Sequence, residues 1–436
     1  MKSFTPKLAV LSAAVILALP AAHAAVDGLA TSGGNARNLA MQSSYFTLHD
    51  DANIWANPAY VGEYAGRAYI EHTEFAGANI KAGPGVLGVY FGRNYGGSVT
   101  SMNQAPISGT TVNGYVGGVS GLQTLSMDNK FDLLYAMDLG SMKAGARLNY
   151  NSFSSSTKNP ISGATTVDEG VLSASDINIS AGIAMKDMPL DVSFVYGMPS
   201  LDSKYTFNAG ATTASEALKH NSAKTMALLG RFEAMKTKQG AVLLSGLYAS
   251  DKGSSAYSGI ATGPVNAASL TFNKEVSTLA AYATYNNTAN NNQLVAVTTG
   301  LERVVTKQAD IALVTTPATN TNNTRETTTM AIPVKLAYEL TKLGESQKWA
   351  VRGSMKKNIY TSSTTKNTTV VPAVASTTTE SSGTNAISFG IGAGYVATKG
   401  LTIDAAMNQS VLFAGTNWLS TGAGTLIGRL SITYEM

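Results

Sequence analysis

Apolar and polar residues alternate along most of this chain, and that alternation is what most constrains its fold. In residues 128–138 the apolar side chains take every second position: Phe131, Leu133, Tyr135 and Met137. The positions between them include Lys130, Asp132, Ala136 and Asp138. Because successive side chains of a β-strand point to opposite faces, the pattern predicts a strand with one apolar and one polar face.

The same separation recurs in later segments, at 143–152, 190–198, 225–233, 330–340, 348–356 and 429–436. Segments of about 9–14 residues have the length that a tilted strand needs to cross a bilayer. A face carrying Phe194, Tyr196 and Trp349 would aggregate in water but is stable in lipid. We therefore predict an all-β fold, a transmembrane antiparallel β-barrel, whose closure leaves no strand edge unpaired in hydrocarbon. A soluble β-sandwich or β-helix is the disfavoured alternative, since a soluble sheet can also have one polar face.

The connections between segments alternate in length. Short ones are expected near 139–142, 187–189, 236–239, 287–292, 342–346 and 398–400. Long polar loops are expected near 95–126, 153–174, 199–221, 251–273, 307–325, 361–383 and 413–424. Short periplasmic turns and long outer loops are typical of outer-membrane barrels. Seven long loops predict about fourteen strands, starting near residue 85, with both barrel ends at the short turns. Residues 66–75 are either an extra plug strand or a displaced first strand.

The first 24 residues have the pattern of a cleaved secretory signal peptide. Lys2 and Lys7 precede an apolar run over 8–19, and Ala22-His23-Ala24 supplies the small residues of a cleavage site. The apolar run is too short to span a bilayer as a helix. We therefore expect a signal peptide at 1–24, an N-terminal plug (hatch) at 25–65 and the barrel at 66–436, exported to the outer membrane of a Gram-negative cell.

Composition narrows the classes of partner. The chain has no cysteine, so an exported protein of this length does not rely on disulfides. Charged residues make up only 13% and form no basic cluster, which argues against binding to nucleic acid. The partners expected instead are outer-membrane lipids and a small ligand, and the chain is expected to be a monomer.

The stretch between the signal peptide and the first strands resembles a known family. Arg37, Ala40-Met41, Asp50-Asp51 and Asn57-Pro58-Ala59 are similar to the N-terminal signature of the FadL-type outer-membrane transporters. The run from Tyr69 to Phe75, followed by 85–91, is similar to the first strands of the PorV-like branch of that superfamily. The resemblance covers roughly residues 33–93.

The resemblance implies passive uptake of a small hydrophobic or amphipathic molecule, of the fatty-acid or aromatic-hydrocarbon type, gated by the plug. The plug residues expected to form the gate are Arg37, Asp50, Asp51, Asn53, Asn57 and Pro58. A purely structural alternative is that the Asp and Asn residues cap turns and that Pro58 fixes the backbone. Two further functions stay open: a PorV-like scaffold that binds an exported protein, and a general diffusion porin.

Charged residues on the inward face are candidates for a ligand site. Those proposed for substrate binding are Lys130, Arg147, Arg231, Lys335 and Arg352. Arginine offers a forked donor suited to a carboxylate headgroup. The alternative is that these charges pair with inward carboxylates and hydrate the lumen.

Catalysis, metals and cofactors find little support in the sequence. After the signal peptide only His49, His72 and His220 remain, without the spacing of metal ligands. No G-x-S-x-G motif is present, so we expect a non-enzyme without cofactor. Pro333 lies inside a predicted strand and indicates a bulge or a sideways opening. The C-terminal segment resembles the strand that barrel-assembly machinery recognises, with Met436 in place of the usual aromatic residue.

Overall fold

The computed structural model describes residues 36–42, 45–72, 75–93, 129–160, 167–186, 188–209, 212–220, 224–258, 267–288, 292–314, 320–371, 373–383, 387–407 and 427–436. The predicted signal peptide and the first part of the predicted plug lie outside these ranges. Within them, no helix is long and apolar enough to cross a membrane.

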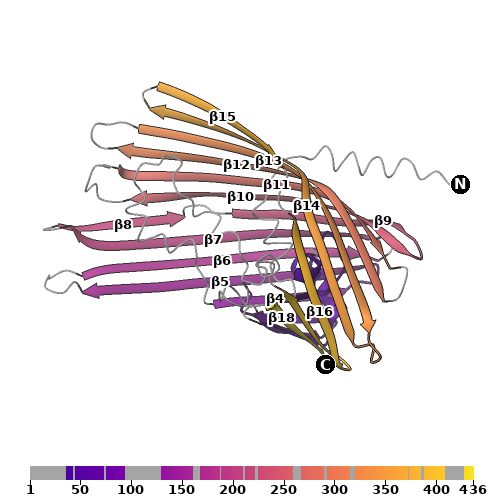
Figure 1. The fold of residues 1–436 in the computed structure, drawn as a ribbon. Coiled ribbons are helices and arrows are strands. Elements are labelled where there is room, and N and C mark those ends of the chain that lie inside the picture. Colours follow the sequence, from indigo (N-terminus) through magenta and orange to yellow (C-terminus); the bar gives the residue numbers. More distant parts are fainter. Residues whose placement is uncertain are drawn as a thin grey trace, which may run out of the picture.

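Strands dominate the described chain and form one antiparallel sheet (Figure 1). Their bounds are β1 Arg67–Glu71, β2 Phe75–Ala82, β3 Gly85–Phe91, β4 Asn129–Asp138, β5 Met142–Pro160, β6 Val167–Met185, β7 Leu190–Ala209, β8 Thr212–His220, β9 Lys224–Lys236, β10 Gly240–Ser258, β11 Ala267–Asn287, β12 Gln293–Val314, β13 Asn320–Leu343, β14 Trp349–Val371, β15 Ala373–Gly383, β16 Ser388–Thr398, β17 Leu401–Met407 and β18 Ile427–Glu435. Among the described residues, three short helices precede them: α3 Ala36–Met41, and the 3₁₀ helices η1 Asp51–Trp55 and η2 Pro58–Tyr64.

The sheet closes on itself between its first and last strands. Arg67 lies opposite Glu435, and the antiparallel register continues to Glu71 opposite Ser431. The Arg67 guanidinium is 2.5 Å from the Glu435 carboxylate, and Arg429 lies 3.4 Å from Glu71 across the same seam. Closure satisfies the backbone groups of both terminal strands, so the prediction of a closed antiparallel barrel is confirmed.

The barrel has sixteen strands, and the prediction of about fourteen was wrong. The other two described strands of the sheet, β8 and β15, lie outside the barrel ring: β8 pairs with the extensions of β7 and β10, and β15 pairs with the extension of β14. The two additional wall strands are β1 and β2, so residues 66–75 enter the wall. Counting long loops missed them because only residues 72–74 connect these strands. Their alternation is also weak, since Ala68, Ala76 and Gly77 give little polarity contrast.

Several segments expected to be loops are extensions of strands. Residues 153–160, 199–209, 251–258 and 361–371 continue β5, β7, β10 and β14 far beyond the length that a bilayer requires. These extensions are rich in Ser and Thr. Threonine is β-branched and suits a strand, so polarity here marks position outside the lipid instead of loop structure. The expected loops 95–126 and 413–424 lie outside the described residues.

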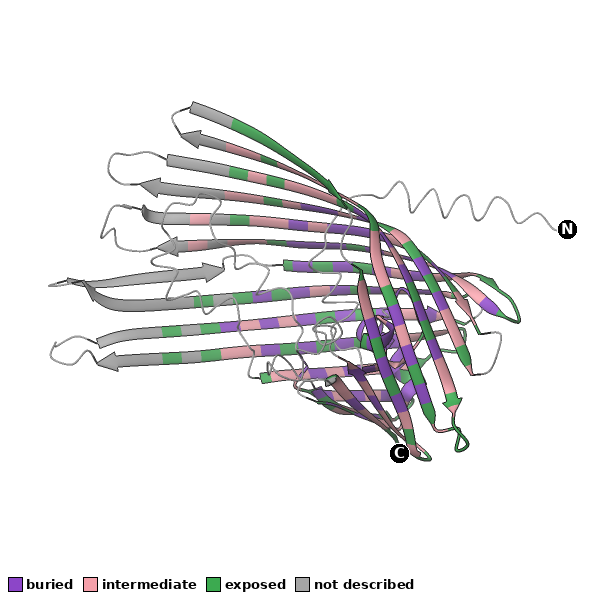
Figure 2. Ribbon diagram, viewed as in Figure 1, coloured by how far each residue is buried: buried purple, intermediate pink, exposed green. Residues whose placement is uncertain are grey.

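Burial confirms the two faces that alternation predicted (Figure 2). On β4, Asp132, Leu134 and Ala136 are buried and point inward, while the residues between them are more exposed. The outward face carries exposed apolar side chains around the ring, including Ile70, Phe91, Phe194, Leu228, Leu301, Leu336, Trp349 and Tyr434. Such a face is stable in hydrocarbon, which fits an outer-membrane barrel.

The wall is taller on one side than on the other. Strands β5–β7 and β10–β14 extend far past β1–β4 and β16–β18 toward one end of the barrel (Figure 1). We call that end the long-loop end and the opposite one the short-turn end. Pairing of β13 with β12 is interrupted next to Pro333, and its register with β14 shifts between Ile332 and Pro333. The predicted bulge is therefore present, and a sideways opening stays a prediction.

Helices α3, η1 and η2 lie inside the ring and form the plug (Figure 1). Helix α3 contacts β13, β14 and β16–β18, and η2 contacts β3–β6 on the opposite side. The main apolar core lies between plug and wall, where Phe46, Trp55 and Tyr60 meet inward residues of the strands. The plug thus supplies the core that a ring of this size cannot build from its wall alone.

Candidate functional site: the plug and its wall contacts

The predicted plug residues begin as local helix caps. The Asp50 carboxylate accepts a hydrogen bond from the Ala52 N–H at 3.1 Å and starts η1. Asn57 accepts from the Ala59 N–H at 3.1 Å and starts η2, with Pro58 at the first helical position. Asx caps satisfy backbone donors that a short helix leaves open. Asn53 donates to the Leu48 carbonyl at 3.1 Å and closes the preceding turn.

Asn57 also joins the plug to the wall. Its side-chain amide donates to the carbonyls of Ile183 on β6 and Val192 on β7, at 3.0 and 3.4 Å. A Cβ at Gly182 would lie 2.0 Å from the Asn57 amide oxygen, and a Cβ at Gly145 would lie 2.4 Å from the Pro58 carbonyl carbon. The two glycines are direct cross-strand partners. Together they form a recess that admits the start of η2.

Arg37 links α3 to the wall. Its Nε and Nη2 donate to the two carboxylate oxygens of Glu339 on β13, at 2.9 and 2.6 Å, and its Nη1 donates to Asp50 at 3.2 Å. Glu339 also accepts from Arg352 at 2.6 Å, and Arg352 in turn binds Asp404 on β17. Fork-to-carboxylate pairs of this kind are among the stronger protein hydrogen bonds. The network therefore joins the plug to three wall strands.

Arg231 on β9 binds a second part of the plug. It donates to the carbonyls of Tyr45 and Leu48, to the Tyr60 hydroxyl and to the His49 ring, and it pairs with Asp191 at 3.1 Å. The Tyr60 hydroxyl donates to the same Asp191 carboxylate. Arg231 is buried, so its five hydrogen bonds replace the water that a guanidinium otherwise requires.

A short chain of polar groups continues from Arg231 toward the short-turn end. Since a guanidinium only donates, the His49 Nδ1 accepts, and Nε2–H is the donor to Glu63 at 2.8 Å. Lys143 on β5 donates to the other Glu63 oxygen at 2.6 Å. Burial alone would raise the pKa of Glu63, but hydrogen bonds from His49 and Lys143 lower it to about 2.

Two further wall cations contact plug backbone. Arg147 donates to the Trp55 carbonyl at 3.2 Å and pairs with Asp132 on β4 at 2.6 Å. Lys335 donates to the Gln42 carbonyl and to the Thr47 hydroxyl. In each case the wall side chain satisfies a plug group that would otherwise be buried without a partner.

Charges within the plug are perturbed by their surroundings. Burial, followed by repulsion from Asp50, raises the pKa of Asp51 to about 6. Burial likewise raises the pKa of Asp50, although Arg37 opposes the shift. Burial would lower the pKa of Arg37, but Glu339 and then Asp50 raise it above its ordinary value.

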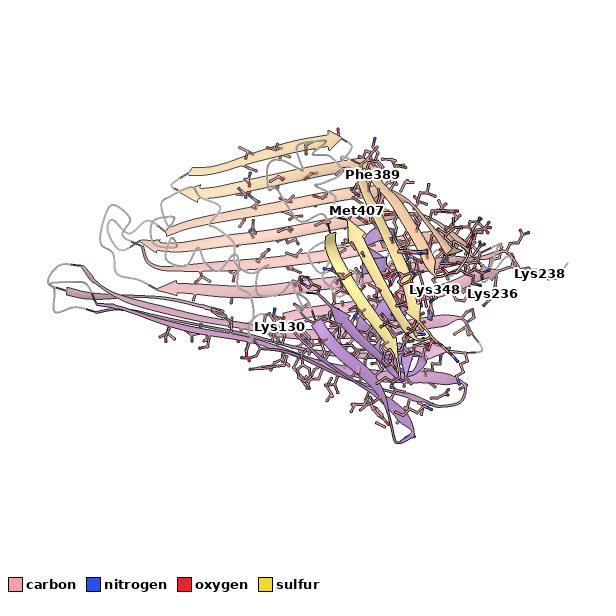
Figure 3. The ribbon with its side chains drawn as sticks, turned by 60° about the horizontal axis from the view of Figure 1, so that its bottom comes forward. Lys130, Lys236, Lys238, Lys348, Phe389 and Met407 are labelled. Atoms are coloured by element: carbon pink, nitrogen blue, oxygen red, sulfur yellow. The ribbon has the colours of Figure 1, made fainter. Side chains whose placement is uncertain are left out.

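The structure thus gives the predicted site residues different positions. Arg147, Arg231 and Lys335 touch the plug directly, and Arg352 reaches it through Glu339. Lys130 is half-buried on β4, away from this set (Figure 3). Sequence reasoning did not single out Asp191, Asp404, Gly145 and Gly182. The two glycines fall on inward positions of the alternation, which is the signal that could have found them.

Inward residues that lie side by side on neighbouring strands form a rung of the wall. Toward the long-loop end from the plug, successive rungs differ in polarity. One rung toward the long-loop end from Asn57, the inward residues Val195, Ala227 and Ala249 form a buried apolar arc. The next rung holds two buried polar pairs, Asn149 opposite Asn178 and Thr225 opposite Asp251, with Gly197 of β7 between the pairs. Asn178 donates to Asn149 at 3.2 Å. Among the described residues no cluster of His, Asp or Glu could hold a metal ion.

Comparison with known proteins gives distant structural similarities. No protein-family model matches the chain, and no curated protein matches it. The ferric yersiniabactin uptake receptor FyuA from Yersinia pestis is similar at a TM-score of 0.42 and 12% identity, covering 64% of this chain and 44% of that one. The chain therefore spans less than half of that receptor.

Two further solved structures match over nearly the whole chain. The toluene transporter TodX from Pseudomonas putida has a TM-score of 0.35 and 11% identity, covering 93% of this chain and 96% of that one. The toluene transporter TbuX from Ralstonia pickettii has a TM-score of 0.36 and 12% identity, with coverages of 92% and 96%.

Proposed function

We propose that this chain is an outer-membrane channel for passive uptake of small amphipathic or hydrophobic molecules, with passage controlled by its plug. The observation that carries the proposal is how the plug is held. It lies inside a closed barrel and is joined to opposite sides of the wall by Arg37, Asn57 and the side chain of Arg231. Hydrogen bonds and ion pairs of this kind can be exchanged for water, so the plug can move without breaking the barrel.

The wall next to the plug supports an amphipathic substrate. An apolar arc at Val195 and Ala227 lies beside a polar rung at Asn149, Asn178 and Asp251. The arc belongs to the core between plug and wall, so an acyl chain or aromatic ring would pack on it once the plug moves, and a hydroxyl or carboxyl group would bond to the polar rung. Asn149 and Asn178 already bond to each other, and a polar group of the substrate can exchange with such a bond whereas a hydrocarbon cannot, so we favour a substrate with one polar group.

The plug contacts suggest separate roles for the gate residues. Arg37 and Asp50 form a latch toward β13, because both lie in one network with Glu339. Asn57 and Pro58 form the anchor, because they sit in the recess of Gly145 and Gly182. Movement then consists of release of α3 while η2 stays seated. Asp51 and Asn53 shape the turn between the two.

A reversible crosslink tests the gate. The chain has no native cysteine, so the variant Ala36→Cys/Ser431→Cys can form one disulfide, at a site where the Ala36 N–H is 3.0 Å from the Ser431 hydroxyl. Uptake of a fluorescent fatty acid into proteoliposomes should fall at least about tenfold on oxidation and return on reduction. The control is Thr402→Cys/Thr433→Cys, which links two wall partners without touching α3. Equal uptake by oxidised and reduced Ala36→Cys/Ser431→Cys would remove the gate from the proposal.

A second candidate function is a scaffold for an exported protein. The observation in its favour is the Thr-rich hairpin of β14 and β15, exposed along residues 376–383, whose strands pair from Thr361–Gly383 to Val371–Ala373. Stoichiometric co-purification of a surface protein that is lost on deleting residues 364–380 would favour this role. A general porin would instead give a large ohmic conductance with the plug in place.

A further inference from the structure

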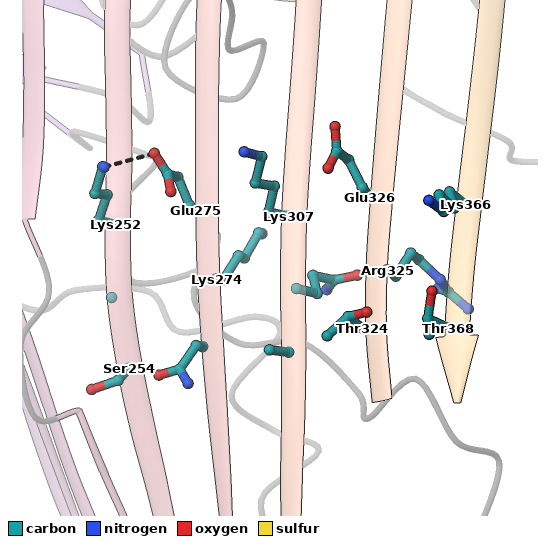
Figure 4. Close-up of a pocket in the computed structure, with 14 residues that line it drawn as sticks. Lys252, Ser254, Lys274, Glu275, Lys307, Thr324, Arg325, Glu326, Lys366 and Thr368 are labelled. Atoms are coloured by element: carbon teal, nitrogen blue, oxygen red, sulfur yellow. Dashed lines mark ion pairs between the residues drawn. The ribbon is translucent and has the colours of Figure 1, made fainter. Parts of the chain in front are cut away.

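A shallow groove of about 620 Å³ crosses the sheet where β10–β14 extend toward the long-loop end (Figure 4). Two rows of side chains line it. The first row is Lys252, Glu275, Lys307, Glu326 and Lys366, and the second is Ser254, Asn273, Ala309, Thr324 and Thr368. Between them lie Gly253, Lys274, Gln308 and Arg325, one on each of β10–β13, which form the floor.

Alternation places both rows on the lipid-facing side of the sheet. Lys252 lies four residues from the exposed Tyr248 on β10, so both point to the same face of the sheet. Glu326 is related in the same way to the exposed Met330 on β13. The neighbouring residue on β10, Asp251, is buried and points inward. The charged row is therefore a continuation of the face that contacts acyl chains lower down.

The first row is a set of direct cross-strand partners. Lys252 lies opposite Glu275, and the register continues through Lys307 and Glu326 to Lys366. Positive and negative side chains therefore alternate at one height across five strands. Lys252 Nζ is 2.7 Å from the Glu275 carboxylate, so this pair is neutralised internally.

The backbone of this row lies just beyond the lipid headgroups, within reach of a lysine side chain. From Met330 to Glu326, and from Tyr248 to Lys252, the chain advances four residues. Four residues span about 13 Å along a strand, or about 10 Å along the membrane normal at a tilt of about 40°. The headgroup region extends roughly 5–8 Å beyond the hydrocarbon on each side. Flexible lysine side chains at this level reach the headgroups readily.

Lys307 and Lys366 leave the row positively charged. Neither forms an ion pair with another described residue, and the only carboxylate between them in register is Glu326. They stand two strands apart, or about 10 Å at the usual strand spacing. A phosphate group bound there would face two ammonium groups. An ammonium group attracts phosphate by its charge and does not need the fixed geometry of a guanidinium fork.

We propose that this groove, on the lipid-facing wall at the long-loop end, binds the phosphate-bearing headgroup of a membrane lipid through Lys307 and Lys366. The site is separate from the lumen and from the plug, so it does not depend on the proposed transport. Short turns are periplasmic in barrels of this kind, which assigns the lipid to the outer leaflet. A bound headgroup here would hold the tall side of the wall at a fixed depth in the membrane.

The test is lipid binding by the full, folded chain in detergent, followed by native mass spectrometry with phosphatidic acid as the probe. Phosphatidic acid should bind more tightly than phosphatidylcholine of the same chain length. The variant Lys307→Gln/Lys366→Gln should weaken binding on the order of 10-fold or more, and Lys307→Arg/Lys366→Arg should retain it. Added salt should weaken binding by the wild type.

The controls distinguish a specific lipid site from general electrostatic attraction between an acidic lipid and positive charge on the protein. Lys236→Gln/Lys238→Gln removes the same charge near the short-turn end (Figure 3) and should leave binding unchanged. Glu275→Gln/Glu326→Gln should strengthen binding, whereas a row that only stabilises the sheet would lose stability and bind no better. Heat-modified migration on a gel checks that each variant is folded. Equal loss in both lysine variants, or no preference for phosphatidic acid, would overturn the proposal.

Discussion

The guanidinium of Arg37 and the carboxylate of Glu339 form a two-pronged pair, with donor–acceptor distances of 2.9 and 2.6 Å, between residues 302 apart in sequence. Glu339 also accepts from Arg352, so one carboxylate lies between two guanidinium groups. Its Oε1 accepts from both arginines, from Arg37 Nε at 2.9 Å and from Arg352 Nε at 2.6 Å. Removing either arginine should therefore change how tightly the other is held.

Replacing Arg37 with Gln should release α3 from the wall. The change leaves Glu339 and Asp50 short of a charged donor, and losing one partner of a buried pair costs on the order of 3 kcal/mol. Chymotrypsin should then cleave the plug at its aromatic residues about 100-fold faster. The control is Lys186→Gln, which breaks an exposed pair with Asp138 and should have no effect. If both variants are cleaved at the wild-type rate, the latch is not in the Arg37 pair.

Replacing Gly145 with Ala should displace η2. The added methyl would lie 2.4–2.5 Å from the backbone of Pro58 and Ala59, which cannot give way like a flexible side chain. Overpacking of this kind costs about 1–3 kcal/mol. Channel recordings should show more frequent openings than in wild type. Gly230→Ala is the matched control, since its methyl would meet nothing closer than 3.9 Å. An unchanged recording for Gly145→Ala would place the anchor elsewhere.

Acidification should strengthen docking of the plug. The pKa of Asp51 is raised from 3.8 to about 6 in the docked plug, first by burial and then by Asp50. A raised acid pKa stabilises the protonated state, so this contribution is fully present below about pH 4 and is lost as pH rises through 6. Two pH units correspond to as much as ~100-fold in the docking equilibrium. Arg37 and Arg67 oppose the shift, and Asp404 adds to it.

The measurement is protease protection of the plug between pH 4 and 8. Wild type should lose protection toward pH 7, and Asp51→Asn should lose less of it, the remainder coming from Asp50, whose pKa burial also raises. Glu63 does not interfere, because its pKa of about 2 gives a contribution that is present above 4.5 and lost only as pH falls toward 2. A profile that is the same in wild type and Asp51→Asn would exclude this residue as the source.

Replacing Arg231 with Lys should destabilise the plug far more than replacing Glu63 with Gln. Lysine keeps the charge but cannot reach Tyr45, His49 and Asp191 together, which the guanidinium fork does. Glu63 forms a partly exposed pair with Lys143, and such pairs contribute about 0–1 kcal/mol. The measurement is the shift in unfolding temperature of each variant from wild type, followed by tyrosine and tryptophan fluorescence. Equal shifts would mean that the fork geometry of Arg231 is not what holds residues 45–49.

Alternation predicted the membrane-facing side of the wall correctly, from Phe131 on β4 to Trp349 on β14. A period of two is local, so it can be read without knowing which strands are neighbours. The strand count came out two short because β1 and β2 contain small residues and share a short connection. The extended strands were mistaken for loops because their Ser and Thr residues resemble those of solvated turns.

The candidate site was predictable only in part. Arg147, Arg231 and Lys335 could be placed on the inward face, but their role as donors to plug carbonyls could not. That role depends on which rung each residue occupies, and rung height depends on shear around the whole ring. Lys130 satisfied the same pattern and lies away from the plug.

The amino-acid sequence by itself determined that this chain builds an outward apolar band and an inward polar one, and that a short capped segment precedes them, because these properties reside in neighbouring residues. Only the tertiary structure decided that Arg67 meets Glu435 to close sixteen strands and that Gly145 and Gly182 align to receive Asn57. Those contacts join residues far apart in the chain, and their positions follow from the register accumulated around the barrel.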